Sequence, residues 1–149
     1  KKNLFQNLLK LKEYGEVLVE QYIPGREIQV AILSENILGA IELKPKRKFY
    51  DYEAKYNPKA QTEHIIPINI KKNKYTEVTS IALKAHKLLR CRGVTRSDFR
   101  FYNNKFYLLE TNTQPGMTSL SLVPEIAKYN NITFKNLIQK ILKDASINK

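Results

Sequence analysis

The spacing of apolar residues along the chain predicts a series of amphipathic helices. Leu4, Leu8 and Leu11 are spaced as on one face of a helix, which should end near Gly15. The clearest helical stripe is stopped by Gly93, and its members are Tyr75, Val78, Ile81, Ala82, Ala85, Leu88 and Leu89. A short helix is predicted after Pro124. A last one should follow Thr133 as its N-cap, with one apolar face formed by Phe134, Leu137, Ile138, Ile141 and Leu142.

Between the helices, runs of β-branched and aromatic residues predict strands. These runs cover residues 17–23, 27–33, 37–43, 94–101 and 106–110. Ser34-Glu35-Asn36 and Asn103-Asn104 provide hairpin turns. Residues 44–64 are polar and lack periodicity, and such a segment within a compact domain is usually functional. Because hairpins dominate, the predicted fold class is α+β, a largely antiparallel sheet covered by helices on one side.

Composition bounds the class of protein. A chain of 149 residues, 42% of them hydrophobic, suffices for one domain with a buried core. It has no apolar run of about 18 residues, which argues against a membrane span. Cys91 alone cannot form an internal disulfide, so a reducing, cytoplasmic setting is expected. The chain opens on Lys1 and its single methionine is Met117, so we expect it to be part of a longer protein.

The net charge of +12 invites a nucleic-acid-binding interpretation, but its make-up argues against it. The excess is mostly lysine, with 20 Lys and 6 Arg, and it accompanies 13 Asn and 15 Ile, a combination that AT-rich coding DNA produces by drift. The basic clusters at 44–48 and 71–74 lie at expected ends of strands or helices, where solvated charge is ordinary. No zinc-finger spacing or aromatic-glycine RNA-binding signature accompanies them. We therefore expect no nucleic-acid partner.

Charged and amide side chains gather on the second hairpin. Alternation puts Arg96 and Asp98 on one face of their strand, and Glu110 and Asn112 on one face of the next. A two-residue loop would place Asp98 opposite Leu109, whereas a three-residue loop pairs Asp98 with Glu110 and Arg96 with Asn112. In the second register two carboxylates and an amide oxygen converge, a donor set that suits Mg²⁺. The alternative is a salt-bridge lattice on an exposed sheet face.

The residues around this hairpin favour the metal site. Residues 113–119 follow it directly, and their Pro-Gly turn can offer backbone N–H groups to an anion. Within the aromatic segment 49–56, Lys55 can neutralise phosphate as a point charge, although composition alone favours a solvated loop there. His64 and His86 have no Cys or second His at ligand spacing, so we expect structural roles for both.

Four stretches form a recognisable set of motifs: VEQYIPGRE at 19–27, FYDYEAKY at 49–56, CRGVTRSD at 91–98 and LLETNTQPGMT at 108–118. Together they resemble the D-alanine:D-alanine ligases, bacterial ATP-grasp enzymes of peptidoglycan precursor synthesis, and the resemblance runs through nearly all of the chain. Such enzymes join two D-alanines through a D-alanyl phosphate made from ATP. The resemblance implies an ATP-grasp C-terminal catalytic domain at residues 16–149, with residues 1–15 as the helical tail of the central ATP-grasp lobe.

The resemblance also implies roles for residues on the nucleotide side. The hinge whose backbone meets adenine corresponds to Glu20, Gln21, Tyr22 and Ile23. Glu27 resembles the acid that holds the ribose hydroxyls. Lys55 resembles the loop lysine that contacts the transferring phosphate, and Tyr56 the loop tyrosine that shapes the amino-acid subsites.

Further matches lie in and after the second hairpin, at the positions that the family uses for its metal and its second D-alanine. The positions of the family's ligands to Mg²⁺ (or Mn²⁺) are taken by Asp98, Glu110 and Asn112. Arg96 and the backbone N–H of Gly116 match the groups that stabilise the tetrahedral oxyanion. Ser121 and Leu122 fall where the family holds the carboxylate of the second D-alanine.

The chain also departs from the family pattern. It lacks the N-terminal domain that binds the first D-alanine, and the loop and lysine of the central lobe that cover the ATP phosphates, so we expect no ligase activity from this chain alone. Gln21 stands at a hinge position where a basic residue is often found, which should alter affinity little because the contact is through the backbone. The resemblance further implies a homodimer for the full-length enzyme.

Other functions stay open at this point. One is a D-alanine:D-lactate or D-alanine:D-serine ligase, although Tyr56 after Lys55 resembles the dipeptide-forming type. A non-catalytic, basic nucleic-acid-binding module is another, and a remnant of a degraded gene is a third.

Overall fold

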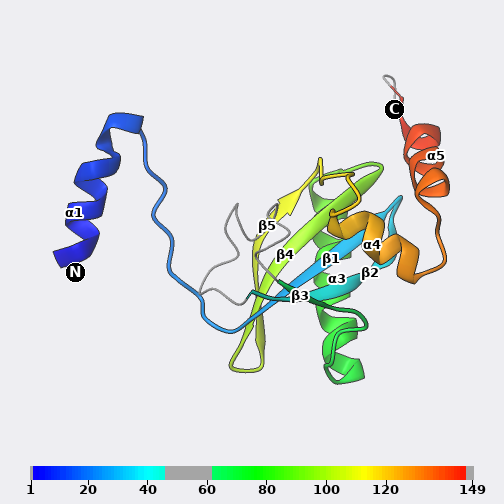
Figure 1. The fold of residues 1–149 in the computed structure, drawn as a ribbon, viewed down its shortest axis with the longest axis horizontal. Helices are drawn as coiled ribbons and strands as arrows, with labels where there is room; N and C mark the ends of the chain where they lie inside the picture. Colours follow the sequence, from blue (N-terminus) through cyan, green and yellow to red (C-terminus); the bar gives the residue numbers. More distant parts are fainter. Residues whose placement is uncertain (1, 46–61, 147–149) are drawn as a thin grey trace.

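The computed structural model describes residues 2–45 and 62–146. A five-stranded antiparallel sheet in the order β3-β2-β1-β4-β5 forms its centre (Figure 1). The strands are β1 (Arg26–Leu33), β2 (Asn36–Lys44), β3 (Glu63–Ile65), β4 (Val94–Tyr102) and β5 (Lys105–Asn112). The helices are α1 (Lys2–Leu11), the short 3-10 helix η1 (Lys12–Tyr14), α3 (Lys72–Leu88), α4 (Leu122–Tyr129) and α5 (Phe134–Asp144).

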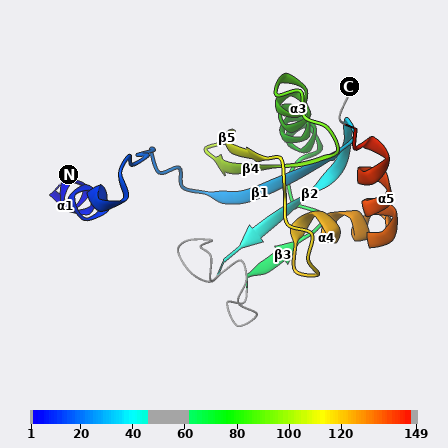
Figure 2. The same cartoon turned by 90° about the horizontal axis from the view of Figure 1, so that it is seen from above.

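Helices cover both faces of the sheet, not one as the sequence pattern suggested (Figure 2). β1 explains the difference, because all its residues from 28 to 33 are buried and successive side chains point to opposite faces. Ile28, Val30 and Ile32 pack in the cluster that α3 covers. Ala31 and Leu33 belong to the cluster that α4 and α5 cover. The α+β class is confirmed, with a core on each side of the sheet.

Most predicted elements form close to their expected bounds. Ser34 and Glu35 have φ values of 47° and 63°, so they make a two-residue turn of the kind that matches the twist of a hairpin. Thr133 caps α5 as expected, its hydroxyl accepting a hydrogen bond from the Asn136 N–H at 3.2 Å. α4 begins at Leu122, slightly earlier than expected, and Pro124 lies in its first turn, where proline is well tolerated. The short edge strand β3 was not predicted.

The predicted strand at 17–23 does not form. These residues run from η1 to β1 without an assigned strand, and Figure 1 shows α1 standing away from the sheet at the end of this stretch. High β-propensity needs a neighbouring strand to pair with, and none is present here among the described residues. Consequently Leu18 and Tyr22 are 82% and 57% exposed. None of the described helices is long and apolar enough to span a bilayer.

Candidate active site

The register of the second hairpin is set by a bulge. Asn103 and Asn104 form a two-residue turn with φ values of 48° and 60°, so Tyr102 pairs with Lys105. That turn alone would bring Asp98 opposite Leu109. A register shift beside Asp98 leaves Leu109 without a partner, and Asp98 therefore pairs with Glu110. The polar register is the predicted one, reached through one extra residue in β5 and not through a longer turn.

This register brings the polar groups of both strands to one face. Arg96 donates from Nε to Asp98 Oδ1 at 2.7 Å and from Nη2 to Asp98 Oδ2 at 2.9 Å, a two-pronged ion pair whose side chains are 13% exposed. Its Nη2 also lies 3.9 Å from Glu110 Oε1. Arg96 pairs with Asn112 across the strands, and Asn112 Oδ1 accepts from the Gln114 N–H at 2.9 Å. Two carboxylates, an amide and a guanidinium thus share one corner of the sheet.

The chain after β5 returns from this corner to α4 (Figure 2). Ser121 is the N-cap of α4, but its hydroxyl turns to the loop, where it accepts from the Thr118 N–H at 3.0 Å and lies 2.9 Å from Thr118 Oγ1. A Cβ at Gly116 would come within 2.8 Å of Ser121 Oγ, so only glycine fits here without displacing that hydroxyl. Met117 packs against the α4 side of the core, as does Leu122, which is 5% exposed.

In the segment where the nucleotide is expected, the structure gives Glu27 a partner. Arg100 Nη2 lies 2.6 Å from Glu27 Oε1, and both side chains are nearly buried. Arg100 also donates to the Gly25 carbonyl at 3.1 Å, and its guanidinium lies 5.9 Å from the centre of the Tyr22 ring. Tyr22 and Glu27 are therefore tied to β4, whereas Glu20 and Gln21 are exposed and Ile23 is half-buried. Lys55 and Tyr56 lie outside the described residues.

Two polar residues at this face were missed by the sequence analysis. Arg100 continues the alternation of Arg96 and Asp98 along β4, which is the signal that could have identified it. Gln29 faces Asp98 across β1 and β4, and its Oε1 is buried without a hydrogen-bond partner in the described part of the chain. An amide inside the otherwise apolar run 28–33 was its signal in the sequence.

The donor set at this corner fits a hard divalent cation. In the described segments no group of three or more His, Cys, Asp or Glu side chains gathers, so a metal here depends on the amide of Asn112 beside Asp98 and Glu110. All three offer oxygen, the ligand type that Mg²⁺ prefers, and Mg²⁺ keeps waters and substrate phosphates as its other ligands. Arg96 already holds both carboxylate oxygens of Asp98. The guanidinium and a cation would therefore compete for that carboxylate.

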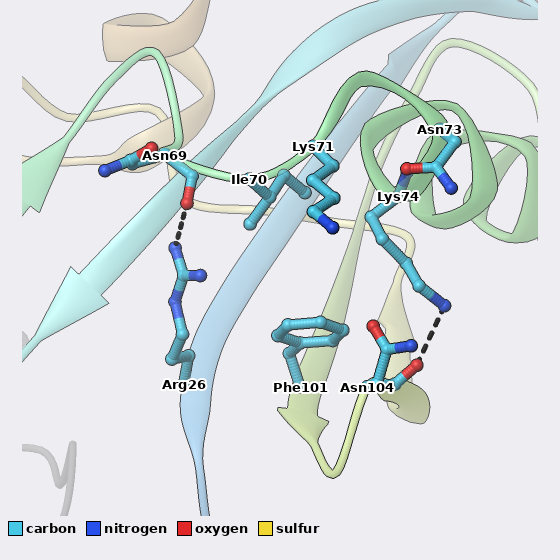
Figure 3. Close-up of a pocket in the computed structure, with 8 residues that line it drawn as sticks. All are labelled: Arg26, Asn69, Ile70, Lys71, Asn73, Lys74, Phe101 and Asn104. Carbon is cyan, nitrogen blue, oxygen red and sulfur yellow. Dashed lines mark hydrogen bonds between the residues drawn. The ribbon is translucent and has the colours of Figure 1, made fainter.

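A second concentration of positive charge lies elsewhere and serves the fold. A cavity of about 400 Å³ opens beside the start of α3, with Arg26, Lys71 and Lys74 around Phe101 (Figure 3). Arg26 makes a bidentate pair with Glu42 at 2.7 and 2.6 Å, and this hydrogen bonding raises the pKa of Arg26. Lys74 bonds Glu77 at 2.7 Å and the Asn104 carbonyl at 2.8 Å. Phe101 packs in the α3 cluster, so this cavity lies on the face opposite the polar corner.

Both histidines have hydrogen-bond partners in the fold. His86 is fully buried, and its Nδ1 lies 2.8 Å from Thr95 Oγ1. Burial lowers the pKa of His86, although the charges of Glu35 and Asp144 oppose the shift. His64 Nδ1 lies 2.6 Å from Glu125 Oε2, which connects β3 to α4.

Comparison with known proteins identifies the family. The family model described as "D-ala D-ala ligase C-terminus" matches residues 2–143. A D-alanine–D-alanine ligase of Pelagibacter ubique is 64% identical over all of this chain, and one of Rickettsia typhi is 47% identical over 89% of it. The chain covers 49% and 42% of those relatives, about half their length or less.

Solved structures agree with the sequence comparison. The crystal structure of a D-alanine–D-alanine ligase from Bacillus anthracis complexed with ATP matches 97% of this chain with a TM-score of 0.82 and 27% identity, over 46% of its own length. A second structure of the ligase from that organism gives the same TM-score at 32% identity. The chain therefore belongs to the D-alanine–D-alanine ligase family, whose C-terminal part it matches.

Proposed function

We propose that this chain is the C-terminal catalytic part of an ATP-dependent ligase that joins two D-alanines through a D-alanyl phosphate, for peptidoglycan precursor synthesis. The observation that carries the proposal is the bulged hairpin, which brings Arg96, Asp98, Glu110 and Asn112 to one face. The family membership supports the same reaction. Residues 16–149 would form the catalytic domain and residues 1–15 the tail of the central lobe, in keeping with the separation of α1 from the sheet (Figure 1).

ATP would bind between this sheet and the lobe that precedes it. Adenine would meet the backbone of Glu20, Gln21, Tyr22 and Ile23, while Glu27 would hold the ribose hydroxyls. The pairing of Arg100 with Glu27 and with the Gly25 carbonyl supports this assignment, because it fixes the end of the hinge against β4. Lys55 would contact the transferring phosphate.

Asp98, Glu110 and Asn112 would hold Mg²⁺ or Mn²⁺, which, when bound, neutralises phosphate charge. This chain's own contribution is to place a guanidinium beside those oxygens. Arg96 and the Gly116 N–H would stabilise the negative charge that develops when the second D-alanine attacks the acyl phosphate. Tyr56, Ser121 and Leu122 would hold that second D-alanine, with the N-terminus of α4 near its carboxylate. The full-length enzyme would work in the cytoplasm as a homodimer.

The test of the oxyanion role is Arg96→Ala in the full-length protein, assayed by coupled ADP release. Loss of one such donor typically lowers turnover about 10²–10³-fold. We expect that loss in kcat, with a much smaller change in the KM for ATP. Lys87→Ala is the matched control, since Lys87 is an exposed cation whose Nζ lies 3.5 Å from Glu35. An unchanged kcat in Arg96→Ala would refute the role.

Two further assays test the proposal. The 149-residue chain alone should form no ADP with D-alanine, because the lobe proposed to cover the ATP phosphates is not part of it. Formation of ADP by this chain would contradict that expectation. A panel of D-alanine, D-lactate and D-serine as second substrate, offered to the full-length protein, tests the dipeptide-forming assignment. Preference for D-lactate or D-serine would overturn it.

A further inference from the structure

A polar contact ties the edge strand β3 to the first turn of α4. His64 Nδ1 and Glu125 Oε2 are 2.6 Å apart although the residues are 61 positions apart in sequence. Their side chains are 27% and 35% exposed, so the contact is partly shielded from water. His64 pairs with Leu43 in the sheet, and Leu43 belongs to the cluster beneath α4. The imidazole therefore lies on the face of the sheet that α4 covers.

α4 is held differently along the rest of its length. At its end, Asn130 Nδ2 donates to the Leu38 carbonyl of β2 at 2.9 Å. In its middle, Ile126 lies so close to Gly39 that a Cβ there would come within 2.8 Å of Ile126 Cγ2. These contacts fix the middle and the end of the helix against β2. His64 and Glu125 supply the polar contact at its beginning.

The beginning of α4 supports the loop of the candidate active site. The Glu125 N–H donates to the Ser121 carbonyl at 3.3 Å, so Glu125 stands one turn after the N-cap. The Ser121 hydroxyl in turn bonds the Thr118 N–H and lies against Gly116. A displacement of the first turn of α4 would thus move Ser121 and, with it, the backbone around Gly116.

We infer that His64 and Glu125 are positioning residues for the subsite that takes the second amino acid. They hold the first turn of α4, and through Ser121 the Gly116 loop, at a set distance from Arg96 on the sheet. The inference rests on the proposed function. A partly exposed polar contact of this kind contributes little to stability, so the expected effect is on placement. A misplacement of 1 Å can lower a rate about 100-fold, and smaller shifts lower substrate affinity.

The experiment uses the full-length protein and compares His64→Ala and Glu125→Ala with wild type. Each should raise the KM for the second D-alanine about tenfold, a fraction of the roughly 100-fold penalty of a 1 Å error, while the KM for ATP stays within twofold. His64→Asn, whose side-chain amide can still donate near the Nδ1 position, should restore most of the affinity. The double variant should be no worse than either single one. Lys87→Ala, in the exposed pair with Glu35, is the control.

Several outcomes would overturn the inference. They are an unchanged KM for D-alanine in both alanine variants, an equal rise in Lys87→Ala, effects that add in the double variant, or no recovery with His64→Asn.

Hydrogen exchange at the Thr118 amide gives a readout that needs no ligase activity. Exchange should be faster in His64→Ala and unchanged along α3; an unchanged Thr118 amide, or equal acceleration in α3, contradicts the positioning role. If the wild type is inactive, the proposed function fails, and the exchange result still decides whether His64 positions the loop.

Discussion

Removing Arg96 should destabilise the domain more than removing its partner Asp98. The pair has two charge-assisted hydrogen bonds, at 2.7 and 2.9 Å, between side chains that are 13% exposed. Arg96→Ala leaves the Asp98 carboxylate largely buried, without that cation and beside Glu110. Asp98→Ala leaves Arg96 with Glu110 Oε1 at 3.9 Å from its Nη2, so the guanidinium keeps an opposite charge. The structure therefore predicts an asymmetry between the two substitutions.

The magnitude follows from the geometry. Hydrogen bonds to charged groups contribute about 1.5–3 kcal/mol each, and breaking a buried pair costs about 3–5 kcal/mol. Because this pair keeps some contact with water, we take the lower end and expect about 3 kcal/mol for Arg96→Ala and about 2 kcal/mol for Asp98→Ala. The double variant should cost about 3 kcal/mol, which leaves a coupling energy of about 2 kcal/mol. A loss of that size is a large fraction of the roughly 5–15 kcal/mol that stabilises a domain.

Urea unfolding of the 149-residue chain, followed by circular dichroism, measures these differences. The exposed pair Lys87–Glu35, put through the same cycle, should couple by less than about 0.5 kcal/mol. A coupling for Arg96 and Asp98 as small as that of the exposed pair would refute the reasoning. So would a greater loss of stability in Asp98→Ala than in Arg96→Ala.

Two further predictions concern stability. Burial lowers the pKa of His86 below its ordinary 6.5, so the unfolded chain binds a proton that the folded protein resists. This contribution to stability is complete above pH 6.5 and is lost as the pH falls below that value. The melting temperature should therefore fall less steeply between pH 7.5 and 5.5 in His86→Gln than in the wild type. Parallel curves of melting temperature against pH would contradict the argument. Gly25→Ala should cost about 3 kcal/mol in urea unfolding, because φ is +106° and a Cβ would overlap the Phe101 carbonyl. Gly15→Ala is the control, because Gly15 has a φ of +89° but open space around it, and it should cost about 1 kcal/mol. Equal losses of stability in the two variants would show that backbone strain alone is measured and that the overlap with Phe101 adds nothing.

The hairpin shows what local pattern predicts well and what it leaves open. Alternation assigned Arg96, Asp98, Glu110 and Asn112 to faces, and the structure confirms that these faces coincide. A three-residue loop and a two-residue turn with a bulge shift the register equally, so the sequence could not distinguish them. The consecutive asparagines were a clue to the shorter turn, since Asn tolerates positive φ better than most residues.

Where contacts join distant segments, the sequence predicted less. The ion pair between Glu27 and Arg100 exists because β1 lies between β2 and β4, an order that no local pattern encodes. The failure of 17–23 to form a strand has the same origin, because β-propensity is realised only beside a partner. Helices lie on both faces because β1 and β2 are buried on both sides. The nearly continuous apolar runs of these two strands already indicated two-sided burial, and the expectation of helices on one side only overlooked that signal.

Much of the positive charge that first suggested nucleic acid belongs, in the described chain, to one of two groups. Arg26, Arg96 and Arg100 are each engaged with an acid at 2.7 Å or less, two of them with the planar, two-pronged geometry that lysine cannot offer. Of these, Arg96 lies beside two carboxylates, those of Asp98 and Glu110. Most lysines are exposed, as drift on a solvated surface produces. Net charge therefore says little about chemistry here. The single bulged residue in β5 turns Glu110 and Asn112 to the face of Arg96, and the oxyanion role proposed for Arg96 depends on that local arrangement and not on the total charge.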